Sequence, residues 1–391
     1  MRTMRQRALA TVVAVVLGGG SLAAQAAPPA RASSHARTLV VSKTGPLRTV
    51  TAALAAAAPG DTLVVEAGVY AEPTIRIVRP VVLLGRPGAV LDGEHQRTIM
   101  RVFAPGVVVR GLAFRNVGES YVEDRAAIRF DSARGCRIED NRFDDAVFGI
   151  YLAATTDCVV ARNVLRGRAR AESSSGNGIH LWHASRIQVL DNRISGHRDG
   201  IYFEFVRASR IEGNVSEGNL RYGLHFMFSD SCRYLRNTFA HNGAGVAVMY
   251  THHMVMDGNR FADNWGGASY GLLLKEISDS RVVHNTFLRN TVGIRAESSN
   301  RLDVRENDFL ANGWALKITA DCEGGVFARN NFLGNSFDVA TNSSSTNDQT
   351  FDGNHWDNYR GYDLNHDGYG DAPYHPVRLF AVAVEANEAV L

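Results

Sequence analysis

Short stretches of alternating apolar and polar residues run through most of the chain. Examples are RIQVLDN (186–192), GIYFEF (200–205), GLHFMF (223–228) and GVAVMY (245–250). Alternation with a period of two predicts β-strands that bury one face and expose the other. The strands are short and tight corners separate them, which is unlike the pattern of a helical protein.

An asparagine phrase recurs between these strands at a nearly constant spacing. In most copies an asparagine is followed two residues later by an apolar residue and, in many cases, five residues later by a second asparagine. The intervals never fall below 22 residues, and a fixed period of this length is the signature of a solenoid. The first asparagine of the phrase stands at positions 116, 141, 163, 192, 214, 237, 259, 285, 307, 330 and 354.

The phrase fits the corner of a stacked coil. Asparagine tolerates the left-handed backbone conformation of a corner, and its amide can bond to the same residue in the coils above and below. We therefore predict an all-β protein, a right-handed parallel β-helix of the pectin-lyase-like type, with about 11 coils. Nothing catalytic follows from the asparagines themselves.

The two ends of the repeat differ from its middle. An alanine-rich segment at 47–58 predicts a helix, and the open end of a solenoid requires a cap because it would otherwise expose its core. We expect one β-helix domain at 38–383, with an N-terminal cap at 38–62 and a closing loop at 355–383. A short tail follows at 384–391.

The first 26 residues have the features of a secretory signal peptide. A basic start precedes an apolar run, and Ala24-Gln25-Ala26 provides a small-x-small cleavage site. The apolar run is too short to span a bilayer, which favours a cleaved signal peptide over an uncleaved membrane anchor. We predict export to the periplasm, with a loose linker at 27–37.

Composition and charge exclude some classes of protein. Hydrophobic residues make up 45% of the chain, which is typical of a folded protein, and the formal net charge is only +2. A near-neutral chain is not expected to have nucleic acid as its main partner.

The register sorts the cysteines and methionines into the core. Cys136 and Cys158 lie one coil apart at inward positions, close enough for a disulfide or for two stacked free thiols. Met254 and Met256 are also assigned to the core. The sequence contains no C-x-x-C motif, which argues against a cysteine-based zinc or redox centre.

The same register places an unusual set of side chains on one outer face. Aromatic and thioether groups are uncommon on solvated strands, and an exposed patch of them usually marks a binding site. Imidazole and thioether groups are ligands that suit copper, so His180, His225, Met227 and Met249 are candidate copper ligands. Trp182, Tyr202 and Glu204 are candidates for contact with a partner. These seven residues come from four neighbouring coils.

A glycan-binding groove is the alternative for this face. Trp182 and Tyr202 would then stack on sugar rings, and Glu204 would act as an acid. The nearest outward carboxylate in the same register, Glu297, is four coils away, roughly 20 Å. That separation is too large for a glycosidase pair, which leaves a polysaccharide lyase or a uronan epimerase as the enzymatic alternative.

The motif DLNHDGYGD near the C-terminus resembles a calcium loop. Asp363, Asn365, Asp367 and Asp371 occupy the first, third, fifth and ninth positions of such a loop. Tyr374 stands where the loop requires glutamate. The alternatives are a structural Ca²⁺ ion and a hydrogen-bonded Asx turn.

Several longer strings resemble the NosD family of periplasmic proteins. They include NGIHLWH, GHRDGIYFEFV, NLRYGLHFMFS, NGAGVAVMY and GYDLNHDGYGDAPYHPV, and the resemblance extends over roughly residues 38 to 383. It implies a non-enzymatic protein that works with an ABC transporter (a permease and an ATPase) and that is peripheral to the membrane through these partners.

The resemblance also implies a role in copper supply. The expected partners are a copper-chaperone lipoprotein and nitrous oxide reductase, whose copper-sulfide centre requires assembly. The family supplies no catalytic residue to transfer. Family members often continue with an apolar and basic tail, whereas this chain stops at VRLFAVAVEANEAVL, so we expect its docking to differ or the chain to be a fragment.

Overall fold

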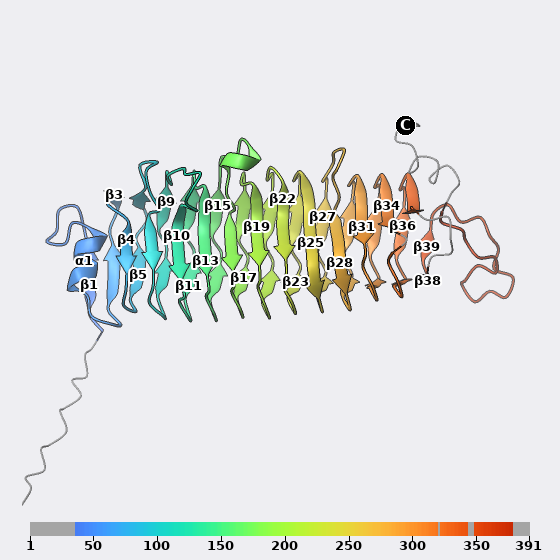
Figure 1. The fold of residues 1–391 in the computed structure, drawn as a ribbon, viewed down its shortest axis with the longest axis horizontal. Helices are drawn as coiled ribbons and strands as arrows, with labels where there is room; N and C mark the ends of the chain where they lie inside the picture. The colour runs from blue at the N-terminus through green and yellow to red at the C-terminus, as the bar shows by residue number, and fades with distance from the viewer. Residues whose placement is uncertain (1–35, 320, 343–347, 378–391) are drawn as a thin grey trace, which may run out of the picture. The chain divides into compact units, whose positions relative to one another are not determined.

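The structure is a computed structural model that describes residues 36–319, 321–342 and 348–377. The predicted signal peptide, residues 27–35 of the linker and the tail at 384–391 lie outside the described residues. Within them, short strands follow one another around a coil and pair in parallel with the corresponding strands of the next coil. Figure 1 shows these strands stacked side by side along the long axis. The predicted all-β parallel β-helix is confirmed.

The strands form three parallel sheets, one for each side of the coil. Sheet A contains β1 (Thr38–Val41), β2 (Thr62–Val65), β5 (Val82–Gly85), β8 (Val108–Arg110), β11 (Arg137–Glu139), β14 (Val159–Ala161), β17 (Gln188–Leu190), β20 (Arg210–Glu212), β23 (Arg233–Leu235), β26 (Val255–Asp257), β29 (Arg281–Val283), β32 (Asp303–Arg305), β35 (Val326–Ala328) and β38 (Thr350–Asp352). Sheet B contains β3 (Gly68–Ala71), β6 (Ala89–Asp92), β9 (Ala113–Arg115), β12 (Arg142–Asp144), β15 (Val164–Arg166), β18 (Arg193–Ser195), β21 (Val215–Glu217), β24 (Thr238–Ala240), β27 (Arg260–Ala262), β30 (Thr286–Leu288), β33 (Asp308–Leu310), β36 (Asn331–Leu333) and β39 (His355–Trp356).

Sheet C contains the longest strands and is the side on which the candidate site lies. Its members are β4 (Ile75–Ile77), β7 (Met100–Val102), β10 (Ala126–Asp131), β13 (Phe148–Ala153), β16 (Ile179–Trp182), β19 (Asp199–Glu204), β22 (Tyr222–Met227), β25 (Ala244–His252), β28 (Leu272–Ser278), β31 (Val292–Glu297), β34 (Trp314–Ile318) and β37 (Phe337–Thr341). The described helices are α1 (Val50–Ala56) and the single 3₁₀ turn η1 (Glu172–Ser174).

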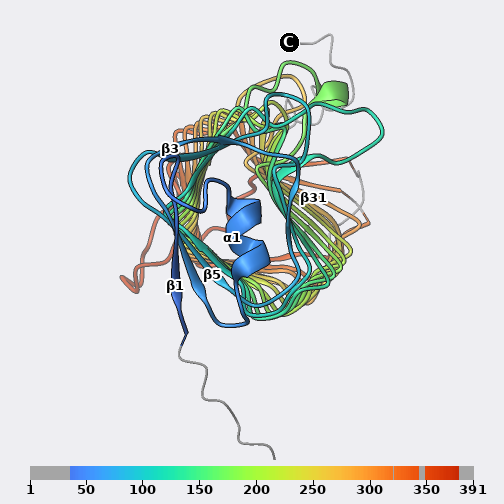
Figure 2. The ribbon, with the colours of Figure 1, turned by 90° about the vertical axis from the view of Figure 1, so that its left-hand side faces the viewer.

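The capping helix lies where the sequence predicted it. Figure 2 shows α1 across the open end of the first coils. Thr49 caps its N-terminus by accepting a hydrogen bond from the Ala52 amide, and the buried Glu72 carboxylate accepts from the amides of Val50 and Thr51. These bonds satisfy donors that the start of a helix leaves free, while Val50 and Leu54 close the core.

The number of coils was underestimated. Sheet A has 14 strands, against the prediction of about 11 coils, because the first coils turn without the asparagine phrase. The position of Asn141 is held by Leu112 in the preceding coil, since Arg142 pairs with Ala113. Asn116 therefore does not belong to the row of corner asparagines, although its sequence context is similar.

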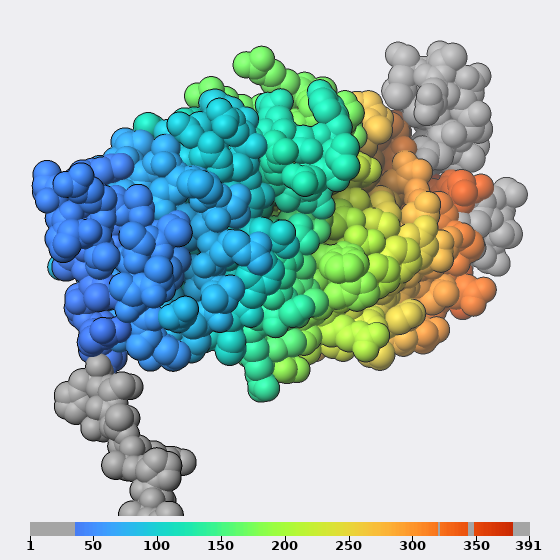
Figure 3. Space-filling view, turned by 60° about the vertical axis from the view of Figure 1, so that its left-hand side comes forward, coloured from blue at the N-terminus to red at the C-terminus, as the bar shows by residue number. Residues whose placement is uncertain are grey.

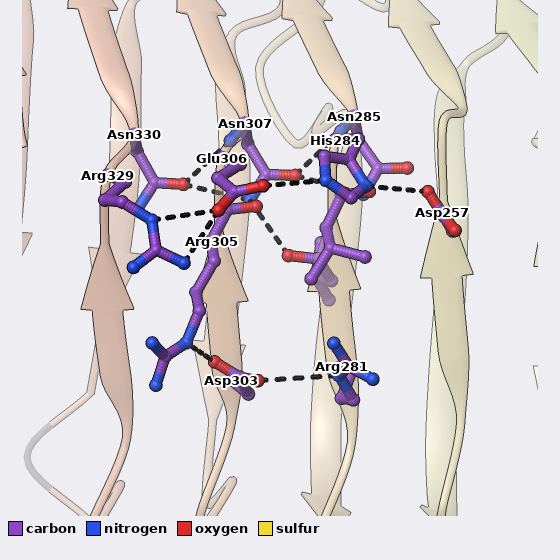
Figure 4. Close-up of polar contacts among 12 residues, drawn as sticks. Asp257, Arg281, His284, Asn285, Asp303, Arg305, Glu306, Asn307, Arg329 and Asn330 are labelled. Atoms are coloured by element: carbon purple, nitrogen blue, oxygen red, sulfur yellow. Dashed lines mark hydrogen bonds and ion pairs between the residues drawn. The ribbon is translucent and has the colours of Figure 1, made fainter.

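From Asn141 onward the corner asparagines form a continuous buried ladder. In each rung the Oδ1 atom accepts hydrogen bonds from the backbone amide and the Nδ2 group of the asparagine one coil before, at about 3 Å in every case. Figure 4 shows the rungs at Asn285, Asn307 and Asn330. The ladder ends at Asn354, and a second ladder runs from Asn219 to Asn335.

The inward assignments are also confirmed. Cys136, Cys158, Met254 and Met256 are buried, and Cys322 is buried outside their column. The structure resolves the alternatives for the first pair in favour of a disulfide between Cys136 and Cys158, which are 22 residues apart. A loop of that length contributes about 3 kcal/mol by restricting the unfolded chain.

Candidate functional site

The outer surface of sheet C carries three columns of side chains in strict register. The central column runs Tyr151, His180, Tyr202 and His225 along β13, β16, β19 and β22. The second column, displaced by two residues, runs Trp182, Glu204, Met227 and Met249. Both columns have the order and the outward direction that the sequence predicted.

The rings of the central column stack on one another. The ring centroids are 4.2 Å apart for Tyr151 and His180 and 4.7 Å apart for His180 and Tyr202. His225 meets Tyr202 edge-on at 5.1 Å. His180 is only 8% exposed and His225 only 5%, so these outward groups are largely shielded from solvent, which sequence periodicity did not predict.

A third column lies three residues before the central column on each strand, and its side chains cover the histidines. It contains Phe148, Asp199 and Tyr222, which the sequence analysis did not select. Phe148 contacts the His180 ring at 5.6 Å and Tyr222 contacts the His225 ring at 4.8 Å.

Neighbouring groups hold Tyr222 over His225. The Arg221 guanidinium lies 4.6 Å from the centre of the Tyr222 ring, and Tyr270 donates a hydrogen bond to the Tyr222 hydroxyl at 3.3 Å. Arg221 also lies 3.9 Å from Glu172 of η1, in the insertion between β15 and β16. The site is therefore built by an insertion as well as by the repeat.

His180 is a neutral imidazole. Burial, with smaller contributions from the charges of Arg198 and Arg129, lowers the pKa of His180 to about 3. Its Nδ1 atom lies 3.0 Å from the Asn177 Nδ2 atom, and with the amide oriented as assigned the amide donates to Nδ1. The proton then sits on Nε2, and the bond from Asn177 takes up the lone pair of Nδ1.

His225 differs from His180 in its hydrogen bonding. Neither of its buried ring nitrogens has a hydrogen-bond partner among the described residues. The nearest charged group is the fully buried Asp199 carboxylate, whose Oδ2 lies 3.7 Å from His225 Nδ1. A buried imidazole without partners is costly unless something else bonds to it, which makes His225 the strongest ligand candidate on this face.

The thioethers of the second column lie beside His225. Met227 is two residues further along the same strand, and Met249 is its partner on β25. Both are half-buried. The predicted copper set does not converge as a whole, because the Tyr202 ring lies between His180 and His225. His225, Met227 and Met249 remain as neighbouring soft donors.

The candidates for partner contact differ in accessibility. Trp182 is 39% exposed at the edge of the face. Tyr202 is half-buried and donates a hydrogen bond to Glu204 at 3.3 Å. Burial, followed by the charge of Glu204, raises the pKa of Tyr202 to about 12, so this hydroxyl stays protonated.

A ridge of aromatic residues, exposed except for the half-buried Tyr250, borders the face and was missed by the sequence analysis. We call His183, Phe205, Phe228 and Tyr250 the corner aromatics; their centroids are 4.6, 5.4 and 4.8 Å apart in succession. All four have φ between 48° and 57°, a left-handed conformation that bulky residues rarely adopt. The corner aromatics are spaced 22 or 23 residues apart, as many of the corner asparagines are. This shared spacing is the sequence signal that could have identified them.

The calcium-like loop uses its oxygens for its own backbone. Asp363 accepts hydrogen bonds from the amides of Asp367 and Gly368, and Asp371 accepts from the amide of Leu364. This is the Asx-turn alternative, and Ca²⁺ is unsupported. Among the described residues, no three or more His, Cys, Asp or Glu side chains are grouped so as to hold a metal ion.

A fourth histidine, His284, sits between two carboxylates on the outer corner of sheets A and B. Its Nδ1 lies 3.0 Å from Asp257 and its Nε2 lies 2.7 Å from Glu306 (Figure 4). The two nitrogens face different carboxylates, so the arrangement is an imidazolium bridge. The hydrogen bonds to Asp257 and then to Glu306 raise the pKa of His284.

This bridge predicts a pH-dependent contribution to stability. Because the pKa of His284 is raised on folding, its contribution is complete below the unfolded value near 6.5 and is lost as the pH rises through the folded pKa. The difference in unfolding free energy between the wild type and His284→Gln should be larger at about pH 6 than at about pH 9. Urea denaturation at both pH values measures it, with His355→Gln as the matched exposed control. An equal difference at both pH values would contradict the charged bridge.

The geometry defines a parallel β-helix protein with an outward aromatic, histidine and methionine face, and comparisons identify its family. The family model described as "Periplasmic copper-binding protein (NosD)" matches residues 162–361. A Pseudomonas aeruginosa protein named "Probable ABC transporter binding protein NosD" is 32% identical over 378 residues, covering 87% of this chain and 86% of that protein. A protein of the same name from Stutzerimonas stutzeri is 30% identical over 319 residues, covering 77% of this chain and 72% of that protein. The chain belongs to the NosD family.

Solved structures share the fold at low sequence identity. The catalytic unit of an α-1,3-glucanase from Streptomyces thermodiastaticus is 16% identical with a TM-score of 0.62, covering 86% of this chain and 71% of that chain. The A-module of the mannuronan C-5 epimerase AlgE6 from Azotobacter vinelandii is 15% identical with a TM-score of 0.54, covering 78% of this chain and 93% of that chain. These similarities establish the fold alone. No helix among the described residues is long and apolar enough to cross a membrane.

Proposed function

We propose that this chain is a periplasmic copper-handling protein that serves an ABC transporter. The description of its family as periplasmic and copper-binding supports the cargo and the compartment, and the names of both relatives support the transporter. The role is one of binding and delivery rather than of catalysis.

One observation carries the copper part of the proposal. His225 is buried, its ring nitrogens have no hydrogen-bond partner in the part of the chain that the structure describes, and Met227 and Met249 lie beside it in register. An imidazole with two thioethers is a soft donor set that suits Cu(I), which tolerates low coordination and sulfur ligands. The half-buried thioethers would let copper enter and leave from the surface.

We further propose that the copper is used in the maturation of nitrous oxide reductase, for assembly of its copper-sulfide centre. The long family strings in the sequence support this role, and its partners would be the transporter permease and ATPase, a copper-chaperone lipoprotein and the reductase. Trp182 and the corner aromatics border the proposed copper site, where a protein partner receiving copper would have to dock.

A glycan-active enzyme has less support from this geometry. Glu204 is bonded to Tyr202, and the next carboxylate in its column, Glu297, is four strands away. The rings of the central column are covered by one another and by Phe148 and Tyr222, which leaves little free face for a sugar.

The decisive test is an anaerobic Cu(I) competition titration of the mature chain. The wild type is expected to bind Cu(I), and His225→Ala and the double variant Met227→Ala/Met249→Ala are each expected to bind at least roughly tenfold more weakly. His241→Ala is the matched control, because this exposed histidine lies on another corner and should leave the affinity unchanged.

Two outcomes would overturn the proposal. Equal affinity of all variants would remove copper from this face, and no binding by the wild type would remove it from the chain. Cleavage or epimerisation of a uronic-acid polymer by the purified protein would contradict the non-enzymatic role.

A further inference from the structure

A polar groove lies on the outer face of the first coils of sheet C. It is a groove of about 490 Å³ between the segments 93–98 and 119–125. All ten residues that line it are polar, and five of them are arginines: Arg76, Arg97, Arg101, Arg125 and Arg129. Only two lining residues, Glu123 and Asp124, are acidic.

Three of these arginines form a stacked row. Arg76, Arg101 and Arg129 are register partners on β4, β7 and β10, which places like charges on adjacent strands about 4.8 Å apart. Like charges opposite one another are destabilising, so the row requires anionic partners. It occupies the same outward column that continues as Tyr151 and His180.

The protein neutralises this row incompletely. Asp131 accepts hydrogen bonds from both Arg101 and Arg129. Burial raises the pKa of Asp131, but the bonds from Arg129 and Arg101 outweigh it and hold the pKa below its usual value. For Arg76, which is exposed, no hydrogen bond or ion pair is found among the described residues; its guanidinium lies 4.7 Å from the centre of the Phe103 ring. Arg76 therefore has all its donors available.

The walls of the groove are fixed in place. Arg125 donates hydrogen bonds to the carbonyl groups of Gln96 at 2.8 Å and Glu119 at 3.1 Å, which ties the two segments together. The segment 119–125 carries Tyr121 and Val122 on its outside, and these side chains are 85% and 95% exposed. In Figure 3 the teal segment that contains this loop stands out from the surface.

We propose that this groove binds an acidic peptide segment of a protein partner. The other four arginines of the groove are each paired with a carboxylate of this chain, so the selection falls to Arg76. Its free guanidinium favours a carboxylate, which it bonds in a planar, two-pronged manner. The exposed pair Tyr121 and Val122 offers apolar contact to a residue that flanks the acidic segment. A glycan is disfavoured, because Arg76 and Arg101 cover the Phe103 ring and Arg129 covers the Tyr151 ring, leaving no aromatic platform in the groove.

The test is a fluorescence anisotropy titration of the full mature chain with a fluorescein-labelled peptide of alternating glutamate and aspartate residues and one leucine. The wild type is expected to bind this peptide and to release it as ionic strength rises. Arg76→Glu and, more mildly, Arg76→Gln should weaken binding, the former by at least roughly tenfold. Arg233→Glu is the matched control, because this arginine is exposed on β23 of sheet A and should have no effect.

Three results would overturn the proposal. They are equal binding by Arg76→Glu and the wild type, equal loss in Arg233→Glu, and tighter binding of oligogalacturonate or inorganic sulfate than of the peptide. Circular dichroism of each variant verifies folding, and exposed Arg76 makes no contact on which folding depends other than Phe103. The titration is done without copper, so its outcome is independent of the copper proposal.

Discussion

Replacing Gly245 by alanine is expected to lower the free energy of unfolding by about 3 kcal/mol or more. Gly245 belongs to a column of glycines that enter sheet C immediately before the candidate site. The members of this column are Gly149, Gly178, Gly200, Gly223, Gly245, Gly271 and Gly293. A Cβ atom at Gly245 would lie 2.3 Å from the carbonyl oxygen of Gly271 in the next coil, and backbone cannot move aside as a side chain can.

Chemical denaturation followed by circular dichroism measures this effect. Gly267→Ala is the matched control, because a Cβ atom there meets nothing within 4 Å, and its stability should equal that of the wild type. An unchanged denaturation midpoint for Gly245→Ala would show that the coils can separate locally. It would contradict the claim that the close approach of Gly245 to Gly271 excludes a side chain.

The repeat could be predicted from the sequence because most coils turn the same corner with the same buried asparagine. A buried corner asparagine bonds to the next one, so the residue recurs at the coil length and reveals the fold. The first coils could not be counted in this way, because Leu112 fills the corner there and leaves no polar signature. Asn116 was misassigned because its local sequence resembles the phrase, whereas the strand pairing places Leu112 at the corner.

The direction of side chains was predictable, but their burial was not. Alternation correctly placed His225 and Met227 on the outer face of β22. The cover over His225 comes from Tyr222 and from Arg221, which is held near Glu172 in a non-repeating insertion. The residues of an insertion do not repeat from coil to coil, so the repeat spacing cannot predict which side chains they cover. The state of His225 consequently depends on contacts that the repeat does not encode.

Both proposed sites lie on sheet C, and each is bordered by an insertion. The loop that carries Tyr121 and Val122 borders the groove lined by Arg76, and the insertion that contains η1 borders the face that carries His225. Figure 2 shows both loops leaving the coils on the same side. The repeat supplies a rigid column of outward positions, and the insertions make two different sites from it.

Replacing Asn259 by alanine, in the interior of the ladder, is expected to cost about 3 kcal/mol of unfolding free energy. Its Oδ1 accepts from the amide and the Nδ2 group of Asn237, and its Nδ2 donates to the Tyr234 carbonyl and to Asn285. Alanine would leave the buried amide of Asn237 without its acceptor and remove a donor from the Tyr234 carbonyl. Each buried polar group that loses its partner costs about 1–3 kcal/mol.

The position of a rung in the ladder should set the size of the loss. Asn354 is the last rung and is half-buried, so water can replace its bonds and Asn354→Ala should cost less than Asn259→Ala. Asn331→Ala is the control, because the side chain of this exposed asparagine bonds only to Asp308 among the described residues. Its loss should change stability by no more than about 0.5 kcal/mol. Urea denaturation of the three variants gives the order directly. Equal costs at Asn259 and Asn331 would mean that packing of the coils, rather than the amide ladder, stabilises this corner of the β-helix.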